Sequence, residues 1–166
     1  MKNLNISITV VACAFLLQVA GADVWEDLAK FKYTDGNNTA QEAEKQLRAS
    51  PSAANPAIEK KLIVVLTSRD ATQDGKAIAC RLLQQIGTDN AVSALSDLLT
   101  DEVLSHYALL PLERLQSSSA DKAMRDALSK APAKLKVGLL GSIGERRDAK
   151  ALKAIQVLAK DRDIAV

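Results

Sequence analysis

The chain has 166 residues, enough for one domain with a sizeable core. Aromatic residues make up only 3% of it while alanine and leucine abound, which favours closely packed helices over a β-sandwich. The formal net charge of +2 is close to neutral, so the sequence gives no electrostatic argument for binding nucleic acid or an anionic membrane surface.

Residues 1–22 have the pattern of a signal peptide and are not expected to belong to the fold. Lys2 supplies a short positive start, and residues 6–17 form an apolar stretch of signal-peptide length. The small residues 20–22 occupy the positions that a signal peptidase reads. The pattern predicts cleavage before Asp23 and export of the chain to the periplasm or the exterior.

Two alternatives for this segment would bring a membrane into play. An uncleaved anchor is the first, because residues 6–22 reach the lower limit of a spanning helix. Lipidation of Cys13 is the second, since residues 10–13 resemble a bacterial lipobox, although few residues precede the cysteine. Cleavage would instead leave Cys80 as the only thiol, with no internal disulfide. Its apolar helix predicts a buried, inert thiol rather than a nucleophile.

Residues 23–70 are expected to form an irregular helical first repeat. Trp25 and Leu28 share a helix face, and we interpret them as a plug over the end of a helical array. The apolar run 62–66 is compatible with a strand, but the helical periods on both sides favour a buried helix. The segments with helical patterns are 24–31, 39–49 and 57–68.

The rest of the chain, residues 71–166, contains an internal repeat. Residues 82–99 return 57 residues later, with a degraded copy 29 residues along between them. The period is therefore 28 to 29 residues, and each unit contains two helical patterns. A repeat of this kind is typical of an α-solenoid. The matching positions are Leu82, Leu83, Ile86, Gly87, Ala94 and Leu95 with Leu139, Leu140, Ile143, Gly144, Ala151 and Leu152.

Helix boundaries and inward faces follow from the same patterns. We expect a turn at 69–75, a helix end at Gly87 in the left-handed conformation with Asp89 capping the next helix, and a second helix end at Gly144. Pro111 lies inside a helical pattern and is expected to kink it. Predicted core residues of the repeats are Ala79, Leu82, Leu83, Ile86, Ala91, Leu95, Leu98, Leu99, Val103, Leu104, Tyr107, Ala108, Leu112, Leu115, Ala120, Ala123, Met124, Ala127, Leu128, Leu135, Leu139, Leu140, Ile143, Leu152, Ile155 and Leu158.

The last residues read as the beginning of another unit. Residues 160–163 have the composition of an inter-repeat turn, and 164–166 resemble the first residues of a helix. A solenoid normally finishes with a capping element that has a polar outer face. We therefore expect the last repeat to be incomplete at Val166, as in the N-terminal part of a longer array or in a truncated reading frame.

The repeat resembles the HEAT family, and in particular its short form, the PBS-lyase HEAT-like repeat. The segments LLQQIGTDNAVSALSDLLTDE and GERRDAKALKAIQVLAKDRD carry the likeness most plainly, and DEVLSHY resembles a segment of exported bacterial HEAT-repeat proteins. Three units match, at 75–99, 101–128 and 133–159. The resemblance implies an all-α, armadillo-type right-handed superhelix of about four repeats. Family members are mostly scaffolds that bind proteins; some are chromophore lyases, and a related group repairs DNA.

His106 is the only histidine, so a multi-histidine metal site is excluded. Ser105 precedes it directly, but adjacent residues on a helix point in different directions and do not form a nucleophile–base pair. We interpret His106 as a partly exposed residue between packed helices. A role as general base would need an acid such as Asp101 or Glu102 beside it.

The most basic local cluster comprises Arg146, Arg147, Lys150 and Lys153, extended by Lys134 and Lys136 if these face the same way. Glu145 and Asp148 lie within it, which favours ion pairs over phosphate binding. With His106, these four cationic residues are the candidate partner-binding residues. The sequence has no GxxxxGK, GxGxxG, HExxH or paired CxxC motif, and it predicts no catalytic residue, metal or cofactor.

Three functions remain open at this point. The first is a non-catalytic, exported HEAT-repeat scaffold that binds a protein partner. The second is a lyase-type HEAT protein, or the N-terminal arm of an enzyme whose catalytic part lies beyond residue 166. Nucleic-acid binding is the third, and the export signal and near-neutral charge argue against it.

Overall fold

The computed structural model describes residues 23–160 (the side chain of Ala54 apart), and these residues form an all-α protein without strands. Predictions for residues 1–22 and 161–166, the signal peptide and the start of a further helix, lie outside the described part. Short 3-10 helices at Tyr33–Asp35, Ser52–Ala54, Asp89–Ala91 and Ala149–Ala151 join the longer elements. The α-helices are α1 (Val24–Lys30), α2 (Asn38–Ala49), α3 (Asn55–Thr67), α4 (Gln73–Ile86), α5 (Val92–Ser96), α6 (Ser105–Arg114), α7 (Ser118–Lys130), α8 (Ala133–Glu145) and α9 (Leu152–Leu158).

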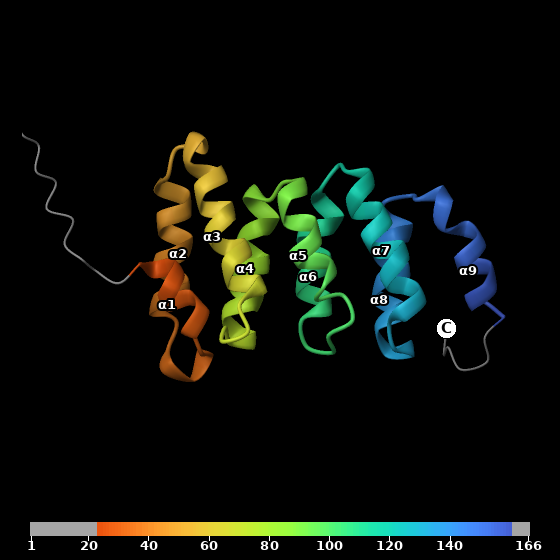
Figure 1. The fold of residues 1–166 in the computed structure, drawn as a ribbon, viewed down its shortest axis with the longest axis horizontal. Helices are drawn as coiled ribbons and strands as arrows, with labels where there is room; N and C mark the ends of the chain where they lie inside the picture. The colour runs from red at the N-terminus through yellow and green to blue at the C-terminus, as the bar shows by residue number, and fades with distance from the viewer. Residues whose placement is uncertain (1–22, 161–166) are drawn as a thin grey trace, which may run out of the picture.

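The helices stand side by side along the longest axis of the molecule, from α1 and α2 at one end to α9 at the other (Figure 1). One layer contains α1, α4, α6 and α8, each packed against the next. A second layer contains α3, α5 and α7, again in order. Consecutive helices also pack across the layers, α3 on α4 and α7 on α8, so that the fold grows by pairs of helices.

The core is a continuous seam of leucine and alanine between the two layers. The helical patterns predicted at 24–31, 39–49 and 57–68 are confirmed as α1, α2 and α3, and Trp25 and Leu28 are both buried. Small alanine side chains let helix backbones approach while leucines fill the remaining space. Fully buried side chains of the seam include Leu28, Leu62, Leu82, Leu83, Leu95, Leu99, Leu112, Met124, Leu128, Leu139 and Ile143.

Helix α4 begins earlier than predicted, because Thr72 caps it inside the segment expected to be a turn. The Thr72 hydroxyl accepts from the backbone N–H of Gly75 at 3.0 Å and donates to the carbonyl of Phe31 at 2.5 Å. Gly75 is required there, since a Cβ atom would lie 2.2 Å from the carbonyl oxygen of Leu28. Thr72 therefore caps the start of α4 and at the same time holds it against the end of α1, where Phe31 lies.

The two predicted glycine helix ends are wrong in detail. Gly87 follows α4 with φ −61° and ψ 145°, which is not left-handed, and Thr88 rather than Asp89 caps the next turn. Glycine is still needed at position 87, because a Cβ there would lie 2.6 Å from the carbonyl oxygen of Leu83. Gly144 lies inside α8, and Arg147 takes the left-handed conformation with φ 52°. In the first case lack of space for a side chain requires the glycine. In the second case the helix ends one residue after the glycine, at Glu145, and the left-handed residue is Arg147.

Some residues predicted to point inward are exposed. Val103 is 46% exposed because residues 101–104 form a non-helical turn that precedes α6, and they do not belong to the first turn of that helix. Leu152 is 57% exposed, whereas its repeat counterpart Leu95 is fully buried. Ile86, Tyr107, Leu115, Leu140, Ile155 and Leu158 are only partly buried. The helical period was read correctly in these cases, but the period does not say whether another helix covers that face.

Some of the side-chain hydrogen bonds between helices join residues 29 or 30 positions apart. Glu59 accepts from the backbone N–H of Thr88, 29 residues away, at 2.6 Å. The hydroxyl of Ser119 donates to Asp89, 30 residues away, at 3.1 Å. Ser142 and Glu113, 29 residues apart, are linked at 2.5 Å. Each bond therefore connects equivalent regions of successive helix pairs.

Candidate interaction surface

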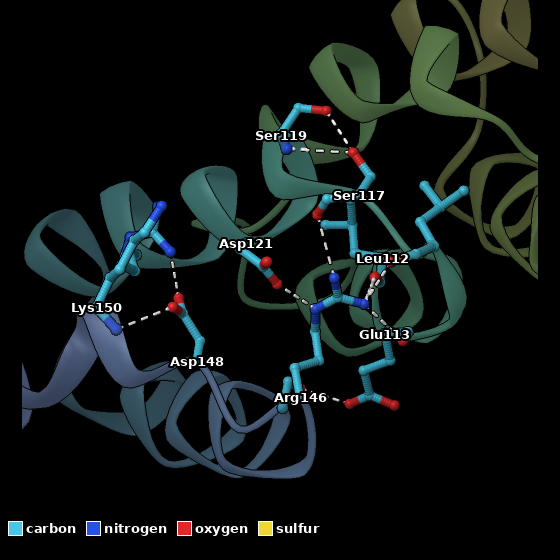
Figure 2. A network of polar contacts seen from close by, with 11 residues as sticks. Leu112, Glu113, Ser117, Ser119, Asp121, Arg146, Asp148 and Lys150 are labelled. Atoms are coloured by element: carbon cyan, nitrogen blue, oxygen red, sulfur yellow. Dashed lines mark hydrogen bonds and ion pairs between the residues drawn. The ribbon is translucent and has the colours of Figure 1, made fainter.

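Arg146 differs from the other members of the predicted basic cluster, because its side chain is only 8% exposed. Its Nε–H donates to Asp121 at 2.5 Å (Figure 2). The two terminal nitrogens donate to four carbonyl oxygens, at 2.5 to 3.1 Å, that follow one another at the end of α6 and the start of α7. These acceptors belong to Leu112, Glu113, Leu115 and Ser117.

The last carbonyls of an α-helix have no partner within the helix, so a buried cation that binds them satisfies groups that would otherwise be costly to bury. Arg146 does this for α6 from the loop after α8. A planar guanidinium with five donors suits the task, and lysine would not reproduce it. Although the sequence places Arg146 among the partner-binding candidates, the structure uses it as an internal link and removes it from that set.

The acidic residue next to it in the chain is also used internally. Asp148 is 6% exposed in its side chain and forms an ion pair with Arg125 of α7. Its other oxygen accepts from the backbone N–H of Lys150 at 3.1 Å, which caps the 3-10 helix before α9 (Figure 2). The ion pairs expected between neighbouring repeats are therefore present, although their partners come from α7 rather than from within the cluster.

The remaining cluster residues Arg147, Lys150 and Lys153 are exposed on the loop after α8 and the first turn of α9. None of them forms an ion pair with another residue of the described range. Lys134 and Lys136 lie at the opposite end of α8, about 20 Å away by the rise of a helix of 13 residues. They do not extend the loop cluster, and they form a second basic region beside the start of α8.

His106 is exposed on the first turn of α6, with its ring centroid 3.8 Å from that of Tyr107. The carboxylate of Asp101 is occupied by the backbone N–H groups of Val103 and Leu104, both at 2.8 Å. No hydrogen bond or ion pair within residues 23–160 joins His106 to a carboxylate. The structure thus places the histidine on the surface, without the acid partner that a general base would use.

Cys80 lies at the centre of α4 and is fully buried. Burial raises the pKa of its thiol to about 12, with a smaller opposing effect from Lys76. The thiolate is the reactive form of cysteine, so this thiol is inert at neutral pH. Throughout the described residues, no group of three or more histidine, cysteine or acidic side chains is arranged to hold a metal ion.

Sequence reasoning missed one buried polar residue, Glu59 of α3, which is 2% exposed. Its carboxylate accepts from both the backbone N–H and the hydroxyl of Thr88. Glu59 falls in the stretch IEKK, where a charged residue is expected to face solvent, so only the 29-residue separation from Thr88 would have indicated its partner. Like Arg146, it links two helix pairs.

Two of the open cavities lie in different parts of the molecule, one near α6, α7 and α8 and one near α1 and α3. The first, about 540 Å³, is polar and is bordered by Glu113, Asp121, Glu145 and Arg146. The second, about 450 Å³, lies between α1 and α3 beside Trp25 and Val64. At its rim, burial raises the pKa of Asp23, but hydrogen bonds from Lys61 and the backbone of Trp25 outweigh burial and leave that pKa below its usual value. Neither cavity gathers a nucleophile and a base.

Comparison of the chain with protein-family models, with curated proteins and with solved structures gives no match. None of the helices in the described part is long and apolar enough to cross a membrane. The features that remain for function are therefore the exposed faces of the helices, above all the basic end formed by α8 and α9.

Proposed function

We propose that this chain is an exported scaffold of HEAT-like repeats that binds a protein partner and has no catalytic activity of its own. The observation that carries the proposal is the set of hydrogen bonds between residues one period apart. Glu59 to Thr88, Glu113 to Ser142 and Ser117 to Arg146 are each separated by 29 residues. This separation agrees with the period of 28 to 29 residues in the sequence repeat.

A repeat that contacts only its neighbours yields an extended structure whose surface grows with every unit. The second helices of the units, α3, α5 and α7, form one layer and carry exposed polar residues, among them Ser93 and Lys122. Extended surfaces of this kind suit the binding of another protein better than the enclosure of a small substrate. Export is supported by the signal-peptide pattern of residues 1–22.

Site-specific photo-crosslinking in the native host tests the scaffold proposal. A photoreactive residue at Ser93 or Lys122, on the second layer, is expected to yield one discrete cross-linked product. The same residue at Gln85 or Arg114, exposed on the first layer, serves as the matched control and is expected to yield none. Absence of any product from the second layer would overturn the proposal.

Export is tested separately by recovering the chain from the host and sequencing its N-terminus. We expect the mature protein to begin at Asp23 and to be found outside the cytoplasm. A chain that retains residues 1–22 in the cytoplasmic fraction would contradict the exported part of the proposal and leave the scaffold part to the crosslinks.

A further inference from the structure

The pair α8–α9 repeats the pair α4–α5 at an offset of 57 residues, but four apolar residues that are at most 3% exposed in the earlier pair correspond to exposed residues in the later one. In the earlier pair they are Ala77, Cys80, Leu95 and Leu99, each at most 3% exposed. In the later pair they are Lys134, Val137, Leu152 and Gln156, and all four are exposed, Val137 to 56% and Leu152 to 57%. We call these last four residues the C-terminal face.

The unit that follows the earlier pair is formed by α6 and α7, and α7 packs against α5. Helix α6, of 10 residues, packs against both α4 and α5 and follows α4 in its layer. A helix in the equivalent place beside α8 and α9 would cover the C-terminal face. The missing side chain at Gly141, where a Cβ atom would meet nothing within 4 Å, leaves room for such a helix to approach α8.

The chemistry of the face is that of an interface rather than of a core. Val137 and Leu152 keep the apolar character of Cys80 and Leu95. Lys134 and Gln156 are polar, whereas the earlier pair has the buried Ala77 and Leu99 at the matched positions. Permanent cores exclude charged residues, whereas interfaces between separable proteins combine an apolar centre with a polar rim. The mixed composition of the C-terminal face therefore suits a partner that binds reversibly.

Charge indicates which partner fits. Residues 133–160 contain seven basic and two acidic residues, a net charge of +5, while residues 23–132 contain 13 basic and 16 acidic residues, a net charge of −3. Arg146 and Asp148 are used internally, and Lys134, Lys153 and the other basic residues of α8–α9 make no ion pair within the described range. A positive surface around an apolar centre attracts an acidic partner and repels a basic one.

A second copy of this chain does not meet these requirements. Two C-terminal faces would bring two strongly positive regions together. At the other end of the molecule, α2 neutralises its own charges through the pairs Glu42–Lys45 and Glu44–Arg48, and none of the large exposed apolar residues lies on it. An acidic, partly apolar surface of a different protein would complement the C-terminal face.

We infer that the C-terminal face is a docking site for an acidic amphipathic helix of a partner protein, which lies beside α8 and α9 as α6 lies beside α4 and α5. The inference rests on the proposed scaffold function and adds a second binding place, at the α8–α9 end of the molecule, together with its chemistry. Apolar side chains of the helix contact Val137 and Leu152, and its carboxylates lie near Lys134 and Lys153.

The test titrates the purified full chain into two labelled synthetic peptides and follows fluorescence anisotropy. Both peptides are amphipathic helices of roughly 20 residues with a leucine face, long enough to be helical alone. One carries glutamate and its twin carries lysine on the polar face. We expect the glutamate peptide to bind at least about tenfold more tightly, and its affinity to fall as salt rises.

Variants locate the site. Val137→Ser, Leu152→Ser and Lys134→Glu are each expected to weaken binding of the glutamate peptide about tenfold, without lowering the midpoint of thermal unfolding by more than a few degrees. Val64→Ser removes a valine of similar exposure, 59%, on α3 and is the matched control. It is expected to change the affinity less than twofold.

Equal binding of the two peptides, or equal losses in Val64→Ser and Val137→Ser, overturns the inference. Self-association of the chain in sedimentation that disappears in Val137→Ser assigns the face to a second copy and overturns it as well. If the glutamate peptide does not bind while the crosslinks from Ser93 and Lys122 persist, only the docking inference is contradicted. If neither peptide binding nor crosslinking is observed, the proposed scaffold function is contradicted as well.

Discussion

The pairs α4–α5 and α8–α9 share a sequence frame but not an environment. Leu82 and Leu139 are both buried; α4 packs mainly on α3 and α6, and α8 packs on α6 and α7. Leu95 and Leu152 also match, yet the first is fully buried and the second is 57% exposed. Helices α4 and α5 have neighbours on both sides, whereas α8 packs mainly on the preceding α6 and α7 among the described helices, so residues with matching sequence positions differ in burial.

The largest expected difference between the two pairs is in thiol reactivity at matched positions. In a Cys13→Ser background, Cys80 should react with a thiol reagent at pH 8 at least a hundredfold more slowly than a cysteine introduced by Val137→Cys, because its pKa is raised to about 12 and it is buried. Absorbance of the released chromophore measures both rates. Similar rates would mean that Val137 is covered or that α4 opens readily.

The next largest difference is in stability. Leu95→Ala should lower the free energy of unfolding by about 2–5 kcal/mol, as truncation of a buried leucine does. Leu152→Ala should change it by no more than about 0.5 kcal/mol, because that side chain is already in water. Urea denaturation of both variants gives the comparison, and equal losses would show that Leu152 is buried in solution.

Adjacent arginines sharpen the comparison within the loop after α8. Arg146→Ala should cost about 3 kcal/mol, since it leaves Asp121 and four carbonyl groups near the end of α6 without their donor. Arg147→Ala is its control, with an exposed side chain, and should cost well under 1 kcal/mol. If Arg146→Lys proves as stable as the original protein, the planar donor set is not what holds the pairs together.

The smallest expected effect is a gain. Arg147 has φ 52°, a conformation that costs most side chains about 1 kcal/mol and glycine almost nothing. Arg147→Gly should therefore raise the free energy of unfolding by up to about 1 kcal/mol, less the entropy that glycine adds to the unfolded chain. Thermal unfolding that shifts clearly downward would show that the arginine side chain contributes contacts of its own.

Much of the fold was predictable from periodicity alone. Apolar residues at helical spacing identified the helices and many residues of the seam, such as Leu82, Leu83, Met124 and Leu139, but missed others such as Ile78 and Leu109. Helix ends were less predictable, because a glycine can mark either a lack of room for a side chain or a left-handed backbone. The sequence around Gly87 and Gly144 does not distinguish the two. Only the backbone shows which requirement applies.

The candidate surface was predicted in composition but not in arrangement. The sequence identified the basic cluster and anticipated its ion pairs, yet it grouped Arg146 with Arg147, Lys150 and Lys153. The partners of Arg146 are backbone carbonyls about 30 residues earlier in the chain, which no side-chain pattern reveals. The exposure of Leu152 depends likewise on what stands beside α9, a property of the neighbour and not of the helix.

The contacts of Arg146 with residues far back in the chain limit which insertions and deletions the protein tolerates. Its guanidinium meets the carbonyl of Ser117 only when 29 residues separate them. The hydrogen bond between Glu59 and Thr88 requires the same separation of 29 residues. One codon gained or lost within α7 or α8 would rotate the following helix by about 100° and carry the arginine away from its acceptors. A duplication or deletion of a whole unit preserves this separation. Length variants of this protein should therefore differ by whole units, and single-codon changes should be confined to the ends of the array.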